Sequence, residues 1–206
     1  MLEEGTLNPD RADKAVAAIS RNAASLRQLI DDLMDTSQLV SGRMRLTIGV
    51  VDLAEVVRDA IEAVRLSADN KNVALMAHIE PGLPSMRGDA GRLKQVVWNL
   101  AANAIKFTPK GGEVTVRLAS IDRGLRLEVR DSGIGIDAAF LPHVFERFRQ
   151  ATVPSAGQGG VGLGLAIVRH LVELHGGTVS AHSAGLGQGS TFVIELPITT
   201  PGAAPG

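Results

Sequence analysis

The sequence contains no cysteine and no tyrosine, and its 206 residues include one tryptophan and five phenylalanines. Without cysteine, disulfide bonds, thiolate catalysis and cysteine-based zinc sites are excluded, and nothing indicates an oxidising compartment. Aromatic residues make up 3% of the chain, so stacking of nucleic-acid bases on aromatic side chains is not expected. The formal net charge is −1, which provides no basic field to attract polyanions. We therefore expect no nucleic-acid partner.

Long hydrophobic runs are also missing. No apolar stretch approaches the roughly 18 to 20 residues that span a membrane, and no signal peptide opens the chain. Hydrophobic residues make up 45% and charged residues 21%, which is ordinary for a soluble globular protein. We expect a cytoplasmic piece with no membrane contact of its own, although the full-length protein can still be anchored in a membrane.

The most informative stretch that is present runs from Asp89 to Thr108 and has the pattern of a two-faced helix. Asp89 is a suitable N-cap, and Pro109 with the glycines that follow it ends the helix. At about 100° per residue, one face is apolar and is expected in the core: Leu93, Val96, Val97, Leu100, Ala104 and Phe107. A narrow polar stripe lies roughly opposite: Arg92, Gln95, Asn99, Asn103 and Lys106.

The polar stripe has an unusual composition, because two asparagines lie one turn apart and a lysine follows one turn on. Amide oxygens are hard ligands that suit Mg²⁺, which keeps phosphates as its other ligands. A lysine beside them can neutralise those phosphates. Taken alone, the helix fits equally well an ordinary polar face with capped ends.

The N-terminal part is predicted to be a separate helix from about Pro9 to Val40. Its apolar residues repeat by heptads, as in a coiled coil or helical bundle: Ile19, Leu26, Leu33 and Val40. One helix cannot bury that seam, so a partner is implied, most simply a second copy; the alternative is packing along its own globular domain. Ser41 and Gly42 would end the helix, Arg43–Val51 would be an extended linker, and we place the domain boundary between residues 48 and 49.

The rest of the chain alternates helical and strand patterns. Helices are predicted at Asp52–Ala68, Asp89–Thr108, Asp137–Phe148 and Leu163–His175. Strands are predicted at Val73–Ile79, Glu113–Ile121, Leu125–Arg130, Thr178–His182 and Ser190–Leu196. Residues 149–160 are expected to form a mobile loop, and residues 199–206 a disordered tail. Together these elements predict a two-layer α/β sandwich.

Three glycine clusters follow the asparagine helix. In the first, Asp131–Ile136, a carboxylate at a strand end can accept a hydrogen bond from an exocyclic amine, and the glycines let a flat ring approach the backbone. The second, Gly157–Leu165, leads into a helix whose free N–H groups can bind an anion, although it is neither a dinucleotide fingerprint nor a P-loop. The third, Gly185–Phe192, leads into a strand. Each cluster by itself could be an ordinary turn or loop.

In this order and spacing, the features resemble the N, G1, F, G2 and G3 boxes of the sensor histidine kinases. The boxes are the asparagine helix, Asp-x-Gly-x-Gly from Asp131, Phe145-Glu146-Arg147-Phe148, Gly-x-Gly-Leu-Gly-Leu from Gly160, and Gly-x-Gly-Ser-Thr-Phe from Gly187. The resemblance implies that residues 49–198 are an ATP-binding catalytic domain of the gyrase–Hsp90–histidine kinase–MutL (Bergerat) fold. In that fold, helices cover one face of a mixed, mostly antiparallel sheet.

The same resemblance extends to the N-terminal helix. The family pattern Leu-Ile-Asp-Asp-Leu-x-Asp reappears at Leu29–Asp35. It implies that residues 1–48 hold the second helix of a dimerisation and phosphotransfer domain, and that the full-length protein is a homodimer.

The resemblance also assigns roles. Asn99 and Asn103 would hold Mg²⁺ and the phosphates, with Lys106 on a phosphate, and Asp131 would bind the adenine amino group. Phe145 and Phe148 would anchor a mobile ATP lid, from which Arg147 or Arg149 would reach the γ-phosphate. We expect the catalytic residues to be Asn99, Asn103, Lys106 and Arg147. The other residues expected at ATP are Phe107, Gly133, Gly135, Ile136, Gly160, Val161, Gly162, Leu163, Gly164, Leu165, Gly187, Gly189 and Thr191.

One departure from the family pattern limits what this sequence can do. The phosphoacceptor box, His followed by Glu or Asp, Arg, Thr and Pro, is absent from the context of all five histidines: His78, His143, His170, His175 and His182. Each histidine is interpreted as an ordinary surface or core residue. We expect a chain that binds Mg-ATP, does not phosphorylate itself, and donates the γ-phosphate to a histidine on a missing phosphotransfer helix for transfer to a response regulator receiver domain.

Two functions other than a kinase are compatible with this fold. In related ATPases a glutamate four residues before the metal-binding asparagine activates water, whereas this chain has Asn99 there, which cannot act as a general base. Phosphoryl transfer by a kinase needs positioning and charge neutralisation more than a protein base. The second alternative is a non-catalytic module of the same fold that binds nucleotide or docks a partner. Its boxes would be broken, and here they are intact.

Overall fold

The computed structural model describes residue 34 and residues 44–149 and 162–198, and the account below concerns these residues. The chain divides into two compact units, residues 1–44 and 45–206. The predicted heptad helix over 9–40, apart from Met34, lies outside the described residues, as do residues 1–8, the predicted loop over 150–160 and the tail over 199–206. The second unit carries the whole of the fold described here.

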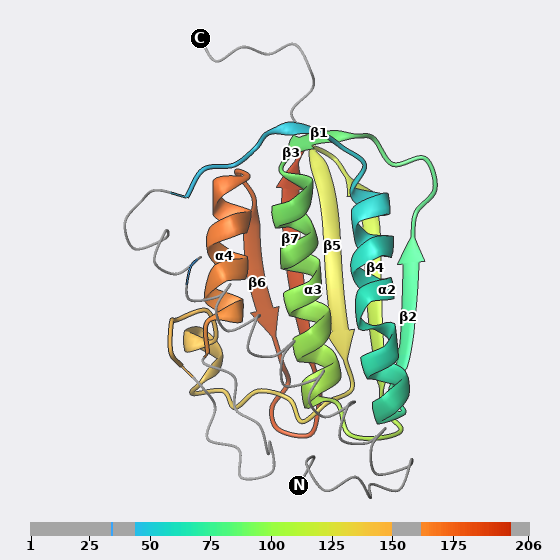
Figure 1. The fold of residues 1–206 in the computed structure, drawn as a ribbon. Helices are drawn as coiled ribbons and strands as arrows, with labels where there is room; N and C mark the ends of the chain where they lie inside the picture. Colours follow the sequence, from blue (N-terminus) through green and yellow to red (C-terminus); the bar gives the residue numbers. More distant parts are fainter. Residues whose placement is uncertain (1–33, 35–43, 150–161, 199–206) are drawn as a thin grey trace, which may run out of the picture. The chain divides into compact units, whose positions relative to one another are not determined.

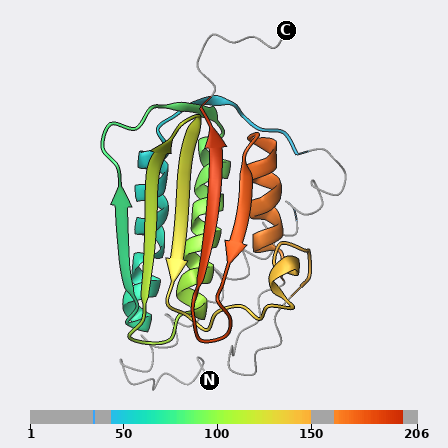
Figure 2. The same cartoon turned by 180° about the vertical axis from the view of Figure 1, so that it is seen from behind.

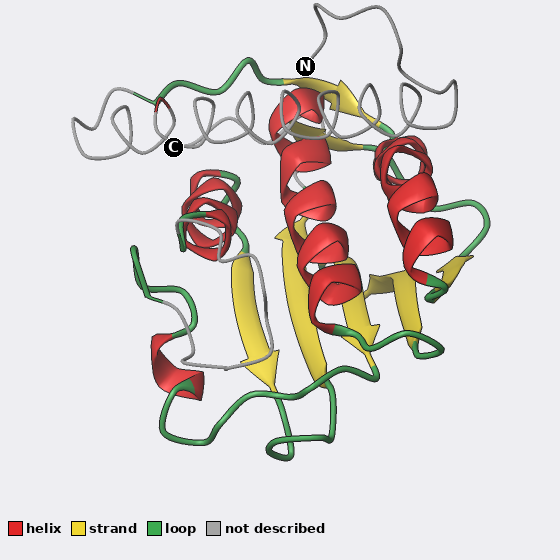
Figure 3. Ribbon diagram, turned by 60° about the horizontal axis from the view of Figure 1, so that its bottom comes forward, coloured by secondary structure: helices red, strands yellow, loops and turns green. Residues whose placement is uncertain are grey.

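The second unit is a two-layer α/β sandwich, as the sequence predicts, with its described helices on one face of a five-stranded sheet (Figures 1, 2 and 3). The sheet order is β2 (Ala74–Ile79), β4 (Glu113–Ile121), β5 (Gly124–Asp131), β7 (Ser190–Pro197) and β6 (Thr178–His182). The β2–β4 pair is parallel and the other three pairs are antiparallel. The prediction of a mixed, mostly antiparallel sheet is therefore confirmed.

The long helices of this layer are α2 (Leu53–Lys71), α3 (Ala90–Phe107) and α4 (Gly164–Leu174). The predicted N-cap Asp89 is confirmed, and Asp52 caps α2 in the same way. The Asp52 carboxylate accepts a hydrogen bond from the N–H of Ala54 (2.8 Å), and the Asp89 carboxylate accepts one from the N–H of Arg92 (3.1 Å). The first N–H groups of a helix have no acceptors within the helix. The two carboxylates supply acceptors for some of them, which explains why the helices begin where the sequence predicts.

The core lies between the helices and the sheet. Strand residues that alternate inward meet the apolar faces of the helices: Val114, Val116, Leu118, Leu125, Leu127, Val129, Phe192, Ile194 and Leu196. Burying each leucine or isoleucine fully contributes about 1.5–3 kcal/mol relative to leaving it exposed. The predicted core face of α3 is buried except for Phe107, which is half-buried because it is the last residue of the helix.

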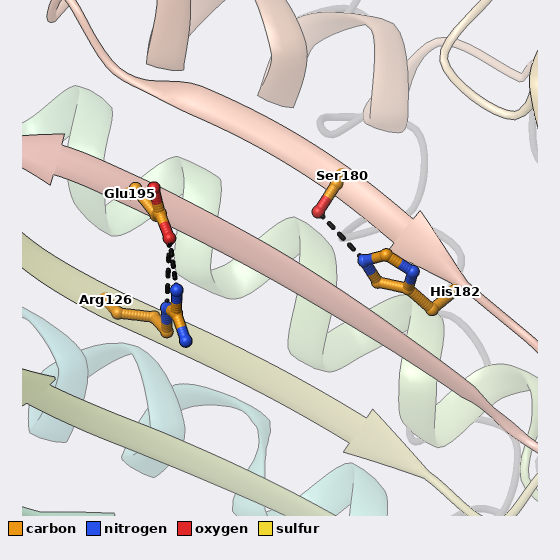
Figure 4. Close-up of polar contacts among 4 residues, drawn as sticks. All are labelled: Arg126, Ser180, His182 and Glu195. Carbon is orange, nitrogen blue, oxygen red and sulfur yellow. Dashed lines mark hydrogen bonds and ion pairs between the residues drawn. The ribbon is translucent and has the colours of Figure 1, made fainter.

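The face of the sheet opposite the helices is polar. Arg126 of β5 donates from Nε to Oε1 of Glu195 on β7 (3.1 Å), and Ser180 Oγ lies 3.2 Å from His182 Nε2 on β6 (Figure 4). Ion pairs this exposed contribute about 0–1 kcal/mol. This face keeps the sheet solvated, and the residues predicted to act on a ligand lie elsewhere.

Two local predictions need correction. A helix over Asp137–Phe148 is wrong: the structure has one short 3₁₀ turn, η1 (Leu141–His143). The Asp137 carboxylate accepts from the N–H of Ala139 (2.8 Å) in a tight local turn, and Phe148 has a φ of 60°, which an α-helix does not tolerate.

The second correction concerns the expected linker. Its last residues form strand β1 (Gly49–Val51), which pairs antiparallel with β3 (Met86–Gly88). The entering chain is thereby fastened beside the start of α3. Within the described ranges, no helix is long and apolar enough to cross a membrane.

Candidate nucleotide-binding site

The two asparagines of the α3 polar stripe lie against the start of α4. A Cβ atom added to Gly164, the first residue of α4, would come within 3.3 Å of Asn99 Oδ1 and 4.0 Å of Asn103 Nδ2. Glycine at this position therefore allows the helix to begin directly beside both amides. The structure brings together two of the predicted boxes, which are 61 residues apart in the sequence if counted from Asn103 to Gly164.

Asn99 is the most unusual polar residue of the site. It is 5% exposed, and its Nδ2 is buried without a hydrogen-bond partner among the described residues. A buried donor left unsatisfied costs about 1–3 kcal/mol, so such atoms call for an explanation. A phosphate oxygen would satisfy Nδ2, and the adjoining amide oxygen is a ligand of the type that Mg²⁺ prefers. The residues present therefore fit a phosphate with its metal ion.

The start of α4 is itself suited to an anion. Leu163 is the N-cap, and no side-chain hydrogen bond from the described residues caps this helix. The first N–H groups of a helix have no intrahelical partners and carry partial positive charge. With Asn99 and Asn103 alongside, these N–H groups form a place where phosphate oxygens can bind.

Lys106 lies one turn beyond Asn103 on α3 and is half-buried. Burial lowers the pKa of Lys106 below its ordinary value, because the charged ammonium loses hydration. Its Nζ lies 5.1 Å from the centroid of the Phe107 ring. A phosphate would give this ammonium a negative partner, which it does not have among the described residues.

Asp131, the carboxylate of the first glycine cluster, is 6% exposed at the end of β5. Its Oδ1 accepts from the N–H of Gly133 (2.8 Å) and of Ser190 (3.3 Å), and its Oδ2 accepts from the Ser190 hydroxyl. An ionised carboxylate offers about four lone-pair sites, so a further donor such as an exocyclic amine can be accepted.

The first and third glycine clusters interlock around this carboxylate. The N–H of Gly187 donates to the carbonyl of Ile134 (2.7 Å), and the N–H of Gly189 donates to that of Gly133 (3.1 Å). The N–H of Ile134 in turn donates to the carbonyl of Phe107 (3.1 Å), which joins both loops to the end of α3. Phe107 therefore contacts the glycine loops through its backbone carbonyl oxygen.

Close packing explains the glycines here. Gly135 has a φ of 68°, and a Cβ on it would collide with the Gly185 carbonyl oxygen. A Cβ on Gly133 would lie 2.6 Å from Asp131 Oδ1. Ile136 is held by its N–H, which donates to Ser183 Oγ (3.0 Å), and Thr191 is half-buried on β7 next to Ser190. These contacts pack the first and third glycine clusters closely around Asp131.

The segment before the second glycine cluster is fastened at its base. The ring of Phe145 meets the ring of Phe192 edge-on, with centroids 6.1 Å apart and planes at 85°. Phe148 is 63% exposed, and its N–H donates to the carbonyl of Gly162 (3.0 Å). Gly162, with a φ of 75°, leads into the buried Leu163 and then Gly164 and Leu165 of α4. Gly160 and Val161 lie outside the described residues.

The two arginines expected at the γ-phosphate, Arg147 and Arg149, are both exposed. Arg149 donates from Nε to Oε2 of Glu146 (3.0 Å), and His143 Nδ1 lies 2.6 Å from Oε1 of the same carboxylate. These contacts, the His143 hydrogen bond first, lower the pKa of Glu146.

Two supporting residues were missed by reasoning from the sequence. Ser190 donates its hydroxyl to Asp131, and its place within the third glycine cluster was the available signal. Lys71, at the end of α2, donates from Nζ to the carbonyls of Ile105 (2.8 Å) and Lys106. Nothing in the local sequence of Lys71 indicates that it caps a different helix.

A small polar cleft also borders Asp131. Its volume is about 170 Å³, and it is lined by Glu113, Thr115, Arg130, Asp131, Ser132, Gly187 and Gln188. Ligand pockets usually measure about 300–1,000 Å³. Because this cleft is small and does not include either asparagine, we place the candidate site between α3, α4 and the glycine loops instead.

Comparisons with known proteins identify a family for this chain. The family model described as histidine kinase-, DNA gyrase B-, and HSP90-like ATPase matches residues 88–200, which include α3 and all three glycine clusters. Histidine protein kinase DivJ of Caulobacter vibrioides is 36% identical over 92% of this chain, which spans 32% of that protein. The chain spans less than half the length of the curated relatives that it matches here.

Solved structures give the same likeness. Full-length ShkA in complex with AMPPNP matches 98% of this chain and 42% of its own, with a TM-score of 0.77 and 32% sequence identity. The mycobacterial sensor histidine kinase MprB matches 74% of this chain and 98% of its own, with a TM-score of 0.65 and 34% identity.

Proposed function

The chain belongs to the family of histidine kinase-, DNA gyrase B- and HSP90-like ATPases, and from that membership we propose that residues 49–198 are the ATP-binding catalytic domain of a two-component sensor histidine kinase. One observation carries the proposal. The Nδ2 of Asn99 is buried and has no hydrogen-bond partner among the described residues, and Asn99 lies beside Gly164 at the start of α4. Residues 1–48 would hold the second helix of the dimerisation and phosphotransfer domain, which makes the full-length protein a homodimer.

ATP would bind with its base at Asp131 and its phosphates at the start of α4. The Asp131 carboxylate accepts from the adenine amino group, inside a pocket shaped by Gly133, Gly135, Ile136, Gly187, Gly189 and Thr191. The triphosphate lies along residues 160–165, with Lys106 on one phosphate. The amide oxygens of Asn99 and Asn103 would hold Mg²⁺, which when bound neutralises charge on the β- and γ-phosphates.

The reaction would be transfer of the γ-phosphoryl group to a histidine of a phosphotransfer helix. An imidazole nitrogen of that histidine attacks the γ-phosphorus, the bond from phosphorus to the β,γ-bridging oxygen breaks, and ADP leaves. Asn99 stands where a water-activating carboxylate would be needed for hydrolysis, and an amide is no general base. The site thus favours transfer over hydrolysis.

The segment from Phe145 to Arg149 would form the base of the lid over ATP. Phe145 is anchored on Phe192, and Arg149 would exchange the Glu146 carboxylate for the γ-phosphate once ATP is bound. Arg147 is exposed and available for the same role. We further propose that the phosphoryl group passes to a response regulator receiver domain, and that these steps take place in the cytoplasm.

Calorimetric titration with ATP, with and without Mg²⁺, tests the proposal. We expect dissociation constants on the order of micromolar for the parent chain and severe loss in Asp131→Asn, whose amide cannot accept in the same way. Asp122→Asn, in the β4–β5 turn, is the matched control. Phosphotransfer to a supplied histidine-bearing helical domain follows. No binding by the parent would instead favour a non-catalytic module that docks a protein partner.

A further inference from the structure

Asp89 joins three separate elements of the fold. Its Oδ1 accepts from the N–H of Arg92 in the first turn of α3, and its Oδ2 accepts from the N–H of Thr47 in the entering chain (2.8 Å). Its own backbone N–H donates to Nε2 of His175, the residue that follows α4 (3.0 Å). One residue therefore connects the start of α3, the end of α4 and the chain that leads into the domain.

The hydrogen bonds of His175 define its protonation state. Because the backbone N–H of Asp89 can only donate, Nε2 must be the bare, accepting nitrogen. Nδ1 lies 2.7 Å from the carbonyl oxygen of Leu171, which can only accept, so Nδ1 carries the proton. His175 is held as the neutral Nδ1–H tautomer, with both ring nitrogens used.

The ring is not needed to end α4. The backbone N–H of His175 already donates to the carbonyls of Leu171 and Val172, and the N–H of Gly177 donates to Val172 (2.9 Å). The ring adds a further bond to the Leu171 carbonyl, which lies within α4, and the bond to Asp89, which reaches outside it. It is also packed in place, because a Cβ on Gly88 would lie 3.1 Å from His175 Cδ2.

Helices α3 and α4 thus touch at two defined points. At one end His175 meets Asp89, and at the other Gly164 meets Asn99 and Asn103. The two points are separated by the length of α4, about 16 Å at 1.5 Å per residue. A helix held at its C-terminal end can neither slide nor tilt freely at its N-terminal end, where the phosphates would bind.

We propose that His175 is a positioning residue for the phosphates of ATP, acting through its bond to Asp89 and through the body of α4. This inference rests on the proposed function, because it concerns the same phosphate site. His175 itself does not touch the nucleotide. It sets where along α3 the first N–H groups of α4 lie, and so their alignment with Asn99 and Asn103.

The test compares ligands with and without phosphates. His175→Asn keeps a donor for Leu171 but is too short to reach Asp89, whereas His175→Gln can reach it with an acceptor. AMP-PNP and adenosine are titrated into each variant and followed by NMR chemical shifts, which measure weak binding as well as tight. We expect His175→Asn to lose about tenfold in affinity for AMP-PNP but less than about twofold for adenosine, and His175→Gln to stay within about threefold of the parent for both.

A general loss of structure would weaken both ligands, so the difference between them isolates positioning. His182→Asn, on the exposed outer face of β6, is the control histidine. Equal losses for the two ligands, or no loss of AMP-PNP affinity in His175→Asn, would overturn the inference. A parent chain that binds no AMP-PNP would instead remove the proposed function, and this inference with it.

The tautomer gives a second readout that needs no variant and no nucleotide. Histidine side-chain ¹⁵N spectra of the parent should show His175 as the neutral Nδ1–H form. An Nε2–H or doubly protonated ring at neutral pH would mean that the bond to Asp89 is absent, which contradicts the proposal.

Discussion

Gly164 begins α4 so close to Asn99 that a single added methyl group would lie 3.3 Å from the amide oxygen Oδ1. This spacing is tighter than most contacts of a Cβ atom, but the neighbour is a side chain and can shift by a few tenths of an ångström. The fold can therefore accept a larger residue at position 164. The same residue would take up space that a phosphate beside Asn99 would need. We therefore expect a residue larger than glycine at this position to affect binding of a ligand more than it affects the fold.

The substitution Gly164→Ala should move stability and binding in opposite directions. In a helix interior, alanine is favoured over glycine by roughly 0.5–1 kcal/mol. Gly164 is the first residue of α4, where the gain is smaller, so the free energy of unfolding without nucleotide should stay level or rise slightly. Affinity for ATP should fall by about tenfold, because the methyl group displaces the Asn99 amide from the phosphate site. Thermal melts with and without ATP measure both effects at once.

The matched control for this prediction is Gly91→Ala, near the start of α3. A Cβ there would lie 3.4 Å from Asp89 Oδ1, an ordinary contact, and Gly91 is exposed. This variant should keep the ATP affinity of the parent. A Gly164→Ala chain that binds ATP as well as the parent would show that no phosphate approaches this end of α4.

Removing the unpartnered amide should also separate stability from function. Asn99→Leu replaces a buried polar side chain by an apolar one of similar size, which relieves a desolvation cost of about 1–3 kcal/mol. The melting temperature without nucleotide should rise. Saturating ATP should raise the melting temperature of the parent further but leave that of Asn99→Leu unchanged. A variant that is destabilised without nucleotide would mean that the Asn99 amide already has a partner in the folded chain.

The organisation of α3 could be predicted because its signals are local. Apolar residues at helical spacing, an aspartate at the cap and a proline after the end all act within a few residues of one another. The pairing of β1 with β3 had no such signal, since each strand has three residues and a run that short cannot show alternation. The error over Asp137–Phe148 has a similar cause, because the N–H of Phe148, which has a left-handed φ, donates to the carbonyl of Gly162, a residue distant in the sequence.

The candidate site also contains residues that could be predicted from the sequence and contacts that could not. Asp131 and the glycines were predicted because their order along the chain resembles a known family, although each cluster alone was an unremarkable loop. The bond between Asp89 and His175 joins residues 86 apart and was not foreseen. His175 was interpreted from the sequence as an ordinary residue, and only the packing of α4 on α3 shows what its ring contacts. Tertiary contacts of this kind leave no trace in periodicity or spacing.

Stability should depend on pH through the carboxylate of Asp89. Its burial by itself raises the pKa, but hydrogen bonds from the N–H groups of Thr47 and Arg92, with the Arg92 charge, bring the pKa below the ordinary value of 3.8. A carboxylate whose folded-state pKa is lowered stabilises the fold above its unfolded pKa. That contribution is lost as the pH falls from about 3.8 through the lowered value.

Asp89→Asn should therefore be less stable than the parent at neutral pH, by about 0.5–1 kcal/mol, since asparagine caps a helix but brings no charge to its N-terminus. The difference between the two proteins should shrink as the pH drops below 4, because the parent then loses its charge as well. Urea unfolding at a series of pH values gives the comparison, with Asp122→Asn as the control. A difference that stays constant down to pH 2 would mean that the Asp89 charge contributes nothing.

Lys71 provides the last prediction, because it ties the end of α2 to the last turn of α3, from which Lys106 projects. Its Nζ donates to the carbonyls of Ile105 and Lys106, two of the acceptors that a helix end leaves unpaired. Desolvation first, and then the charge of Lys106, lower the pKa of Lys71 below 10.5. The charge on Lys71 therefore destabilises the folded state relative to the unfolded state. This destabilisation is lost as the pH rises from the lowered pKa towards 10.5.

Lys71→Met keeps the length of the side chain and removes its donors. We expect a loss of about 1 kcal/mol in the free energy of unfolding at neutral pH, from two carbonyls left to water. The stability of the parent should rise relative to that of the variant as the pH increases through the lowered pKa of Lys71 towards 10.5. Affinity for ATP should fall by about threefold while adenosine binds as before, because the displaced last turn carries Lys106 but not Asp131. Lys110→Met, exposed beyond the end of α3, is the control. Equal losses for ATP and adenosine would indicate that Lys71 supports the base pocket through Phe107 and Ile134 instead.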